Sequence, residues 1–150
     1  MANIQKKYIG LLGGSFDPAH EGHLGISKIA VKKFKLKKIY WVITKKNPFK
    51  NKTFYPLNER IKYAKKIIKD QKKIKIIHLD NKIKSSRIID VINYFIKKKK
   101  IKNILFIIGS DNLILFHKWK SWKKVVKLVK LIVFSRKGYD RKGMKSIVAK

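Results

Sequence analysis

Short apolar runs alternate with helix-periodic segments along the chain, and this alternation constrains the fold more than any other feature of the sequence. Each run is a few residues long, rich in β-branched side chains and apolar at consecutive positions, which is typical of strands covered on both faces. From these runs we predict strands at Tyr8–Leu12, Ile39–Ile43, Ile74–Leu79, Ile104–Ile108 and Leu131–Phe134.

The segments between the runs have the spacing of amphipathic helices. The first helix is predicted at about Glu21–Phe34, and a later one begins beside Pro56, a residue suited to a first helical turn. Apolar stripes at helical spacing mark the other helices: Leu57, Ile61, Ala64 and Ile68; Ile88, Ile92, Phe95 and Ile96; Trp122, Val125, Val126 and Val129.

Strands that alternate with helices in this way predict a three-layer α/β fold, with a five-stranded parallel sheet and helices on both faces. Ligands of such folds bind at the carboxyl ends of the strands, near the point where the strand order reverses. The length of 150 residues fits one domain, residues 1–150.

Composition excludes several classes of protein. The chain has no Cys, which excludes a disulfide framework, a thiolate nucleophile and a Cys-ligated metal. No apolar run approaches the roughly 20 residues that a membrane span needs, and the N-terminal apolar run is too short for a secretory signal. We therefore expect a cytoplasmic protein without a membrane partner. The sequence makes no prediction of its oligomeric state.

The net charge is +32, from 40 Lys and Arg against 8 Asp and Glu. Such an excess normally indicates a polyanionic partner such as nucleic acid. Only four of these cations are Arg, however, and Arg is the residue that reads guanine edges and binds phosphates with two hydrogen bonds. We interpret the charge as a general enrichment in Lys, and we expect only non-specific binding to nucleic acid. The charge also suits a small polyphosphate ligand.

The first strand-to-helix connection, residues 13–25, reads GGSFDPAHEGHLG. Gly13 and Gly14 are expected to let the backbone turn sharply and approach a phosphate without a Cβ in the way. His20 and His23 are three residues apart at a predicted helix N-terminus, where both imidazoles face the same side and the helix dipole favours an anion. A structural His pair and a metal site are the alternatives, but the nearby sequence offers no Cys and little carboxylate. The segment matches neither a Walker A loop nor GxGxxG.

The segment GGSFDPAHEGH resembles the signature of the nucleotidyltransferase superfamily that contains the HxGH motif, whose members transfer a nucleotidyl group from a nucleoside triphosphate. Downstream, residues 107–139 are similar to the bacterial nicotinate-nucleotide adenylyltransferases, which make deamido-NAD from nicotinate mononucleotide and ATP. The matching segments there are Gly109-Ser110-Asp111, Lys118-Trp119 and Arg136-Lys137-Gly138-Tyr139. His20 also favours this branch over the pantetheine-phosphate adenylyltransferases, which usually have Thr at that position. The resemblance implies a Rossmann-like fold.

The resemblance also implies roles for individual residues. His20 and His23 would be the catalytic pair on the ATP phosphates, with His23 nearest the α-phosphate, and Trp119 would stack on the cationic pyridine ring. The implied ATP-binding residues are Gly13, Gly14, Ser15, Phe16, His20, His23, Gly109, Asp111 and Arg136. The implied residues for the mononucleotide are Lys50, Ser86, Ile88 and Trp119.

The chemistry that the resemblance implies needs no general base, because the attacking phosphate is already largely dianionic near pH 7. Alignment and charge stabilisation suffice. Mg²⁺ would be carried mainly by the ATP oxygens, with no metal site on the protein itself. We assign Trp122 to the core, and we expect structural or exposed roles for His78 and His117.

Two departures from the family pattern bear on activity. Ile88 stands where the family has a Thr that receives the nicotinate carboxylate, so backbone amides would have to take over that role. The sequence also ends at Lys150 without the ISSTxIR-like motif that grips the triphosphate, so either the chain is shortened or cations such as Lys45, Lys46 or Arg136 cover the phosphates. The alternatives are an HxGH transferase acting on nicotinamide mononucleotide or phosphopantetheine, and a weakly active or inactive basic protein that binds nucleotides or nucleic acid.

Overall fold

The computed structural model describes residues 8–14, 16–45, 53–79, 82, 87–109 and 122–134. In these residues strands and helices alternate as the hydrophobic pattern predicts. The elements are β1 (Ile9–Gly14), α1 (Glu21–Phe34), β2 (Lys38–Ile43), α2 (Leu57–Ile67), β3 (Ile74–Ile77), α4 (Ile88–Lys97), β4 (Ile104–Gly109), α6 (Trp122–Leu128) and β5 (Lys130–Phe134).

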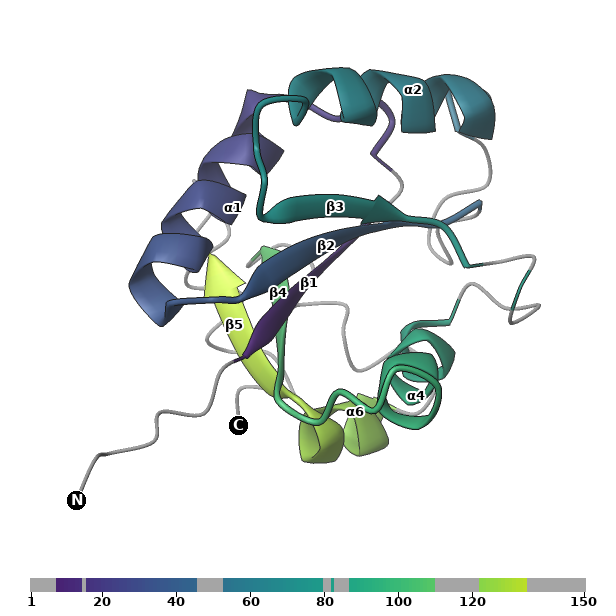
Figure 1. Ribbon diagram of the computed structural model, residues 1–150. Coiled ribbons are helices and arrows are strands. Elements are labelled where there is room, and N and C mark those ends of the chain that lie inside the picture. The colour runs from purple at the N-terminus through teal and green to yellow at the C-terminus, as the bar shows by residue number, and fades with distance from the viewer. Residues whose placement is uncertain are drawn as a thin grey trace.

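The five strands form one parallel sheet in the order β3-β2-β1-β4-β5. The chain moves from β1 outward to β3 on one side and then crosses back to β4 and β5 on the other, so the strand order reverses between β1 and β4. Helices α1 and α2 cover one face of the sheet, and α4 and α6 cover the other (Figure 1). The predicted three-layer, Rossmann-like α/β fold is confirmed.

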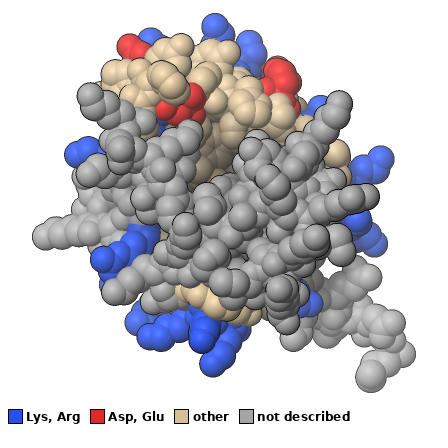
Figure 2. Space-filling view, turned by 180° about the vertical axis from the view of Figure 1, so that it is seen from behind, with Lys and Arg blue, Asp and Glu red and all other residues tan. Residues whose placement is uncertain are grey.

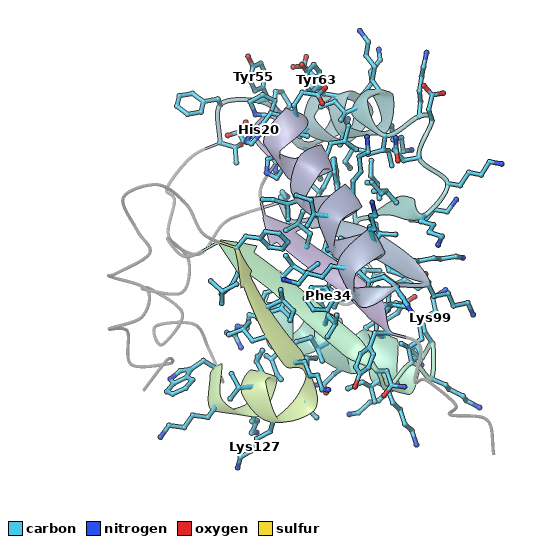
Figure 3. The ribbon with its side chains drawn as sticks, turned by 90° about the vertical axis from the view of Figure 1, so that its left-hand side faces the viewer. His20, Phe34, Tyr55, Tyr63, Lys99 and Lys127 are labelled. Atoms are coloured by element: carbon cyan, nitrogen blue, oxygen red, sulfur yellow. The ribbon has the colours of Figure 1, made fainter. Side chains whose placement is uncertain are left out.

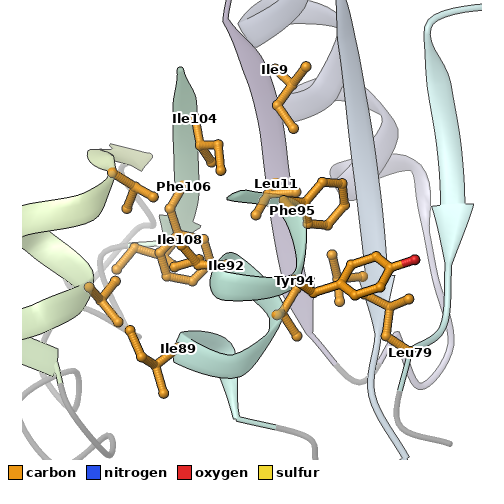
Figure 4. Close-up of a cluster of buried hydrophobic side chains, with 14 residues drawn as sticks. Ile9, Leu11, Leu79, Ile89, Ile92, Tyr94, Phe95, Ile104, Phe106 and Ile108 are labelled. Carbon is orange, nitrogen blue, oxygen red and sulfur yellow. The ribbon is translucent and has the colours of Figure 1, made fainter. Parts of the chain in front are cut away.

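Two apolar cores lie on the two faces of the sheet, and they explain why most consecutive positions of the strands are apolar. Successive side chains of a strand point to opposite faces. Leu11 and Phe106 therefore belong to the core beneath α4 and α6, which is shown in Figure 4. Leu12 and Ile107, the next residues along each strand, belong to the core beneath α1 and α2.

β3 is shorter than predicted, because it ends at Ile77 and not at Leu79. Its pairing with β2 stops at Val42, and beyond that point the side chain of His78 takes over the contact with β2. The ring Nδ1 of His78 lies 2.8 Å from the carbonyl oxygen of Ile43. The expected structural role of His78 is thereby confirmed.

Helix α6 differs from its predicted apolar stripe at one residue. Val125 and Val129 are buried and Trp122 packs against the same core, as expected. Val126 is 37% exposed, so its assignment to the stripe was wrong. Residues 125 and 129 are four apart and share a helix face, whereas residue 126 lies about 100° further round the helix.

Basic side chains are distributed over all four of these helices. Each helix has at least one Lys in its last turn, where a cation interacts favourably with the helix dipole. The space-filling view shows Lys and Arg side chains on several sides of the described surface (Figure 2). This distribution favours the interpretation of the charge as a general enrichment in Lys. In the part of the chain that the structure describes, no helix is long and apolar enough to cross a membrane.

Candidate active site

The predicted site residues that the structure describes lie at the carboxyl ends of β1 and β4, on either side of the strand reversal. Gly14 ends β1 and Gly109 ends β4, the neighbouring strand. Ile88, the first residue of α4, points to the same edge, since its Cδ1 lies 3.9 Å from where a Cβ on Gly13 would be. The structure therefore brings the carboxyl ends of β1 and β4 together with the N-terminus of α4 at one edge of the sheet.

The turn after β1 is made differently from the prediction. Gly13 and Gly14 are still strand residues, and neither has the positive φ that would require glycine. Among the described residues of this turn, Phe16 is left-handed, with φ of 50°. The prediction that the two glycines make the sharp turn was wrong, because both are extended residues of β1. Phe16 as a whole is only 2% exposed, so its side chain is part of the core beneath α1.

His20 and His23 together form the N-terminal cap of helix α1. His20 is the N-cap residue, and its Nδ1 accepts a hydrogen bond from the backbone N–H of Gly22 at 3.0 Å. His23 reaches back, and its Nδ1 accepts from the backbone N–H of His20 at 3.0 Å. This is the reciprocal arrangement of a capping box, built here from two imidazoles whose centroids are 4.0 Å apart.

These hydrogen bonds fix the tautomer of both rings. A ring nitrogen that accepts a hydrogen bond carries no proton, so the proton of each neutral imidazole is on Nε2. Each neutral ring therefore has its N–H donor at Nε2, near the N-terminus of α1, where the helix dipole also favours negative charge. Figure 3 shows His20 at this end of the helix and Phe34 at the opposite end. The arrangement suits an anion such as a phosphate.

Gly22 is required by the position of the His20 ring. A Cβ on Gly22 would lie 2.7 Å from Cε1 and 2.8 Å from Nδ1 of His20, closer than side chains normally approach. The glycine of the HxGH sequence thus leaves room for the capping imidazole.

Two residues outside the expected site connect the histidine turn to the end of β2. The Asp17 carboxylate accepts hydrogen bonds from the backbone N–H groups of Phe54 and Tyr55. Arg60 of α2 is 2% exposed and donates to the backbone carbonyls of Tyr55, Thr44 and Lys45, at 3.1, 2.8 and 3.2 Å.

The sequence pattern indicated no role in the site for Asp17 or Arg60. The contacts of Asp17 join residues 37 and 38 positions apart, and no local pattern shows such pairs. A lone Arg among lysines, on a helix face expected to be apolar, was the one available signal for Arg60.

Several predicted site residues lie outside the described residues, so the structure gives no position for them. They are Ser15, Lys50, Ser86, Asp111, Trp119 and Arg136, together with His117. Within the described part of the chain, no group of three or more His, Cys, Asp or Glu could hold a metal ion.

Comparison with known proteins identifies the family. The profile of the cytidylyltransferase-like family matches residues 11–149. A protein of Pelagibacter ubique, described as a probable nicotinate-nucleotide adenylyltransferase, is 53% identical over 145 residues, which are 97% of this chain and 80% of the relative. The chain belongs to the cytidylyltransferase-like family, in its nicotinate-nucleotide adenylyltransferase branch. It is therefore a nucleotidyltransferase, and the resemblance found in the sequence is confirmed.

Further matches agree. A relative from Ruegeria with the same description is 35% identical over 130 residues, which are 87% of this chain and 68% of the relative. A solved structure of Plasmodium falciparum nicotinic acid mononucleotide adenylyltransferase, complexed with NaAD, superposes with a TM-score of 0.76. At 22% sequence identity it covers 93% of this chain and 71% of that chain, and it supports the fold.

Proposed function

We propose that this chain joins ATP and nicotinate mononucleotide, giving deamido-NAD and pyrophosphate in NAD biosynthesis. The observation that carries the proposal is the reciprocal capping of α1 by His20 and His23, in which both Nδ1 atoms accept backbone hydrogen bonds and the proton of each neutral ring is on Nε2. Family membership and the names of the relatives support the choice of substrates. We place the reaction in the cytoplasm, where ATP is available.

The proposed reaction is a displacement at the α-phosphorus of ATP. A phosphate oxygen of the mononucleotide attacks the α-phosphorus and forms a new P–O bond. The bond between the α-phosphorus and the oxygen that bridges it to the β-phosphorus breaks, and this bridging oxygen leaves as part of pyrophosphate. The attacking phosphate needs no deprotonation, so the protein has to align the reactants and stabilise the developing charge. His23 would donate its Nε2–H to an α-phosphate oxygen and His20 to the neighbouring phosphates, assisted by the N–H groups of the first turn of α1.

The remaining assignments follow the family pattern and stay proposals. The ATP would contact the ends of β1 and β4 through Gly13, Gly14, Ser15, Phe16, Gly109, Asp111 and Arg136. The mononucleotide would contact Lys50, Ser86, Ile88 and Trp119.

Ile88 has an apolar side chain, but it begins α4, whose N-cap residue Arg87 makes no capping hydrogen bond with its side chain. Backbone N–H groups at a helix N-terminus are suited to a carboxylate, so this helix end could receive the nicotinate carboxylate.

The metal would be Mg²⁺ bound to the ATP oxygens, where it neutralises phosphate charge. The described residues fit this arrangement better than a metal site made by the protein. Of the two carboxylates near the histidines, Asp17 already accepts backbone hydrogen bonds at both of its oxygens, and Glu21 belongs to no group of three or more His, Cys, Asp or Glu among the described residues that could hold a metal ion.

The proposal is tested by measuring pyrophosphate release from ATP with each of three acceptors: nicotinate mononucleotide, nicotinamide mononucleotide and phosphopantetheine. We expect turnover with nicotinate mononucleotide and a lower kcat/KM with the other two. A preference for another acceptor would make the chain a transferase of a different branch. Absence of release with all three would favour the alternative of an inactive nucleotide-binding protein.

A further inference from the structure

Two polar side chains are buried behind His23, in the core between the sheet and α1. Trp41, in β2, and Ser27, in α1, are each 0% exposed. The indole Nε1–H of Trp41 donates to the Ser27 hydroxyl at 2.7 Å, and the Ser27 hydroxyl donates to the backbone carbonyl of His23 at 2.8 Å. A continuous chain of hydrogen bonds therefore runs from the middle of the sheet to the first turn of α1.

The same tryptophan also supports the ring of His23. Phe16 stacks on Trp41 with centroids 5.1 Å apart, and its other neighbour is the His23 imidazole at 4.6 Å. The indole and the imidazole are themselves 5.9 Å apart. Trp41 thus contacts His23 in two ways, through Ser27 to its backbone and through Phe16 to its ring.

We propose that Trp41 and Ser27 are positioning residues for His23, holding its backbone and ring so that Nε2–H faces the α-phosphate. This inference rests on the proposed function. Neither side chain can touch a substrate, because both are fully buried. Their effect on catalysis would pass through His23, whose donor must be held to within a fraction of an ångström to act on the transition state.

The arrangement is more specific than packing requires. An apolar side chain at position 41 would fill the core without a polar atom that needs a partner. A Ser hydroxyl that bonds the carbonyl four residues back slightly destabilises a helix and often bends it. Here that bond falls on the turn that presents His23, and the indole donor orients the hydroxyl that makes it. A positioning role accounts for both features together.

The test compares Trp41→Phe with a control, Tyr40→Phe, in the full chain. Trp41→Phe keeps an aromatic ring under Phe16 and removes the Nε1–H donor. Tyr40 is the next residue of β2 and packs on the opposite core against Phe95, so its substitution removes a polar atom without reaching His23. Two readouts are used: kcat and KM for each substrate, and the ¹⁵N signals of the His23 imidazole, which report its tautomer without any turnover.

We expect Trp41→Phe to lower kcat by about tenfold to a hundredfold with KM within about twofold of wild type. The His23 ¹⁵N signals should shift toward a mixture of tautomers. Tyr40→Phe should leave both readouts unchanged. If Trp41→Phe fails to fold, Ser27→Ala, which removes the hydroxyl that bonds His23, carries the same expectation.

The inference is overturned if the variant melts at a lower temperature while kcat and the His23 signals stay at wild-type values, since Trp41 would then serve stability alone. A fall in kcat with unchanged His23 signals would also overturn it. If the wild type transfers nothing to any acceptor, the proposed function fails. The His23 ¹⁵N signals then still test the positioning role: a shift in Trp41→Phe supports it, and signals identical to those of the wild type contradict it.

Discussion

Substituting Gly22 by Ala should separate the catalytic role of His20 from the stability of the fold. The new Cβ would lie 2.7 Å from Cε1 and 2.8 Å from Nδ1 of His20, so one of them must move. His20 is exposed, whereas the backbone of Gly22 is part of α1. The imidazole will therefore swing away and lose its hydrogen bond to the Gly22 N–H.

The expected changes in stability nearly cancel. Loss of an N-cap hydrogen bond costs about 1 kcal/mol, whereas replacing Gly by Ala within a helix gains up to about 1 kcal/mol. The expected change in rate is much larger. Moving one donor away from the phosphates should lower kcat on the order of 100-fold, as loss of a donor to a developing charge typically does.

Gly25→Ala is the matched control, because a Cβ on Gly25 would meet nothing within 4 Å. It should raise the free energy of unfolding by up to about 1 kcal/mol and leave kcat unchanged. Pyrophosphate release and urea denaturation would be measured for both variants beside the wild type. The reasoning is refuted if Gly22→Ala keeps a wild-type kcat, or if its main effect is a loss of stability well above 1 kcal/mol.

Further predictions concern the second histidine, the tryptophans, the core and the charge. His23→Ala should lower kcat on the order of 100- to 1000-fold in the pyrophosphate assay and leave the circular dichroism spectrum unchanged. Trp119→Ala should raise the Kd of nicotinate mononucleotide about thirtyfold, measured by calorimetry, because a desolvated cation–π contact contributes about 2 kcal/mol. Trp122→Ala should instead lower the melting temperature, because Trp122 packs against the core. Gly10→Ala should cost about 1–3 kcal/mol of stability in urea denaturation, because its Cβ would lie 3.0 Å from Leu36 and 3.1 Å from Ile39 in a filled core. Binding to duplex DNA should be indifferent to sequence and fall steeply with rising salt in a fluorescence anisotropy titration.

For each of these predictions, a specific result would contradict it. A folded His23→Ala variant within about threefold of the wild-type rate would remove the histidine from the mechanism. If Trp119→Ala destabilises the fold and Trp122→Ala weakens the ligand, the two assignments are reversed. An unchanged free energy of unfolding for Gly10→Ala would show that Leu36 and Ile39 shift to accommodate the added methyl group without a loss of stability. Tight, sequence-selective DNA binding near physiological salt would favour a nucleic-acid partner.

The fold could be predicted from the sequence because the sheet is covered on both faces. That arrangement makes most of each strand apolar at consecutive positions, and such runs stand out between lysine-rich helices. The expected α/β fold needed nothing beyond this alternation and the handedness of crossover connections. The error at Val126 arose because a short helix contains too few turns for its apolar face to be located by spacing alone.

The candidate site could be predicted only in part. The HxGH sequence located His20 and His23, because both lie in one local turn. Their supports come from elsewhere in the chain: Trp41 reaches Ser27 across 14 positions, and Asp17 reaches the segment before α2 across 37. The left-handed conformation of Phe16 was missed as well, since no local pattern in the sequence marks it and its ring partner, Trp41, lies in the next strand.

The contacts of Asp17 and Arg60 have a consequence for how this sequence can vary. Both residues bind backbone groups of other residues, through the amides of Phe54 and Tyr55 and the carbonyls at positions 44, 45 and 55. Every residue type has a backbone carbonyl, and every residue type except proline has a backbone N–H. The side chains at these partner positions can therefore be exchanged without loss of the hydrogen bonds that hold the histidine turn. Arg60 itself cannot be exchanged for Lys, because a single ammonium cannot reproduce the planar set of donors. Substitution of arginines elsewhere in the chain by lysine would therefore leave the hydrogen bonds of Asp17 and Arg60 intact, and with them the connection between the histidine turn and α2.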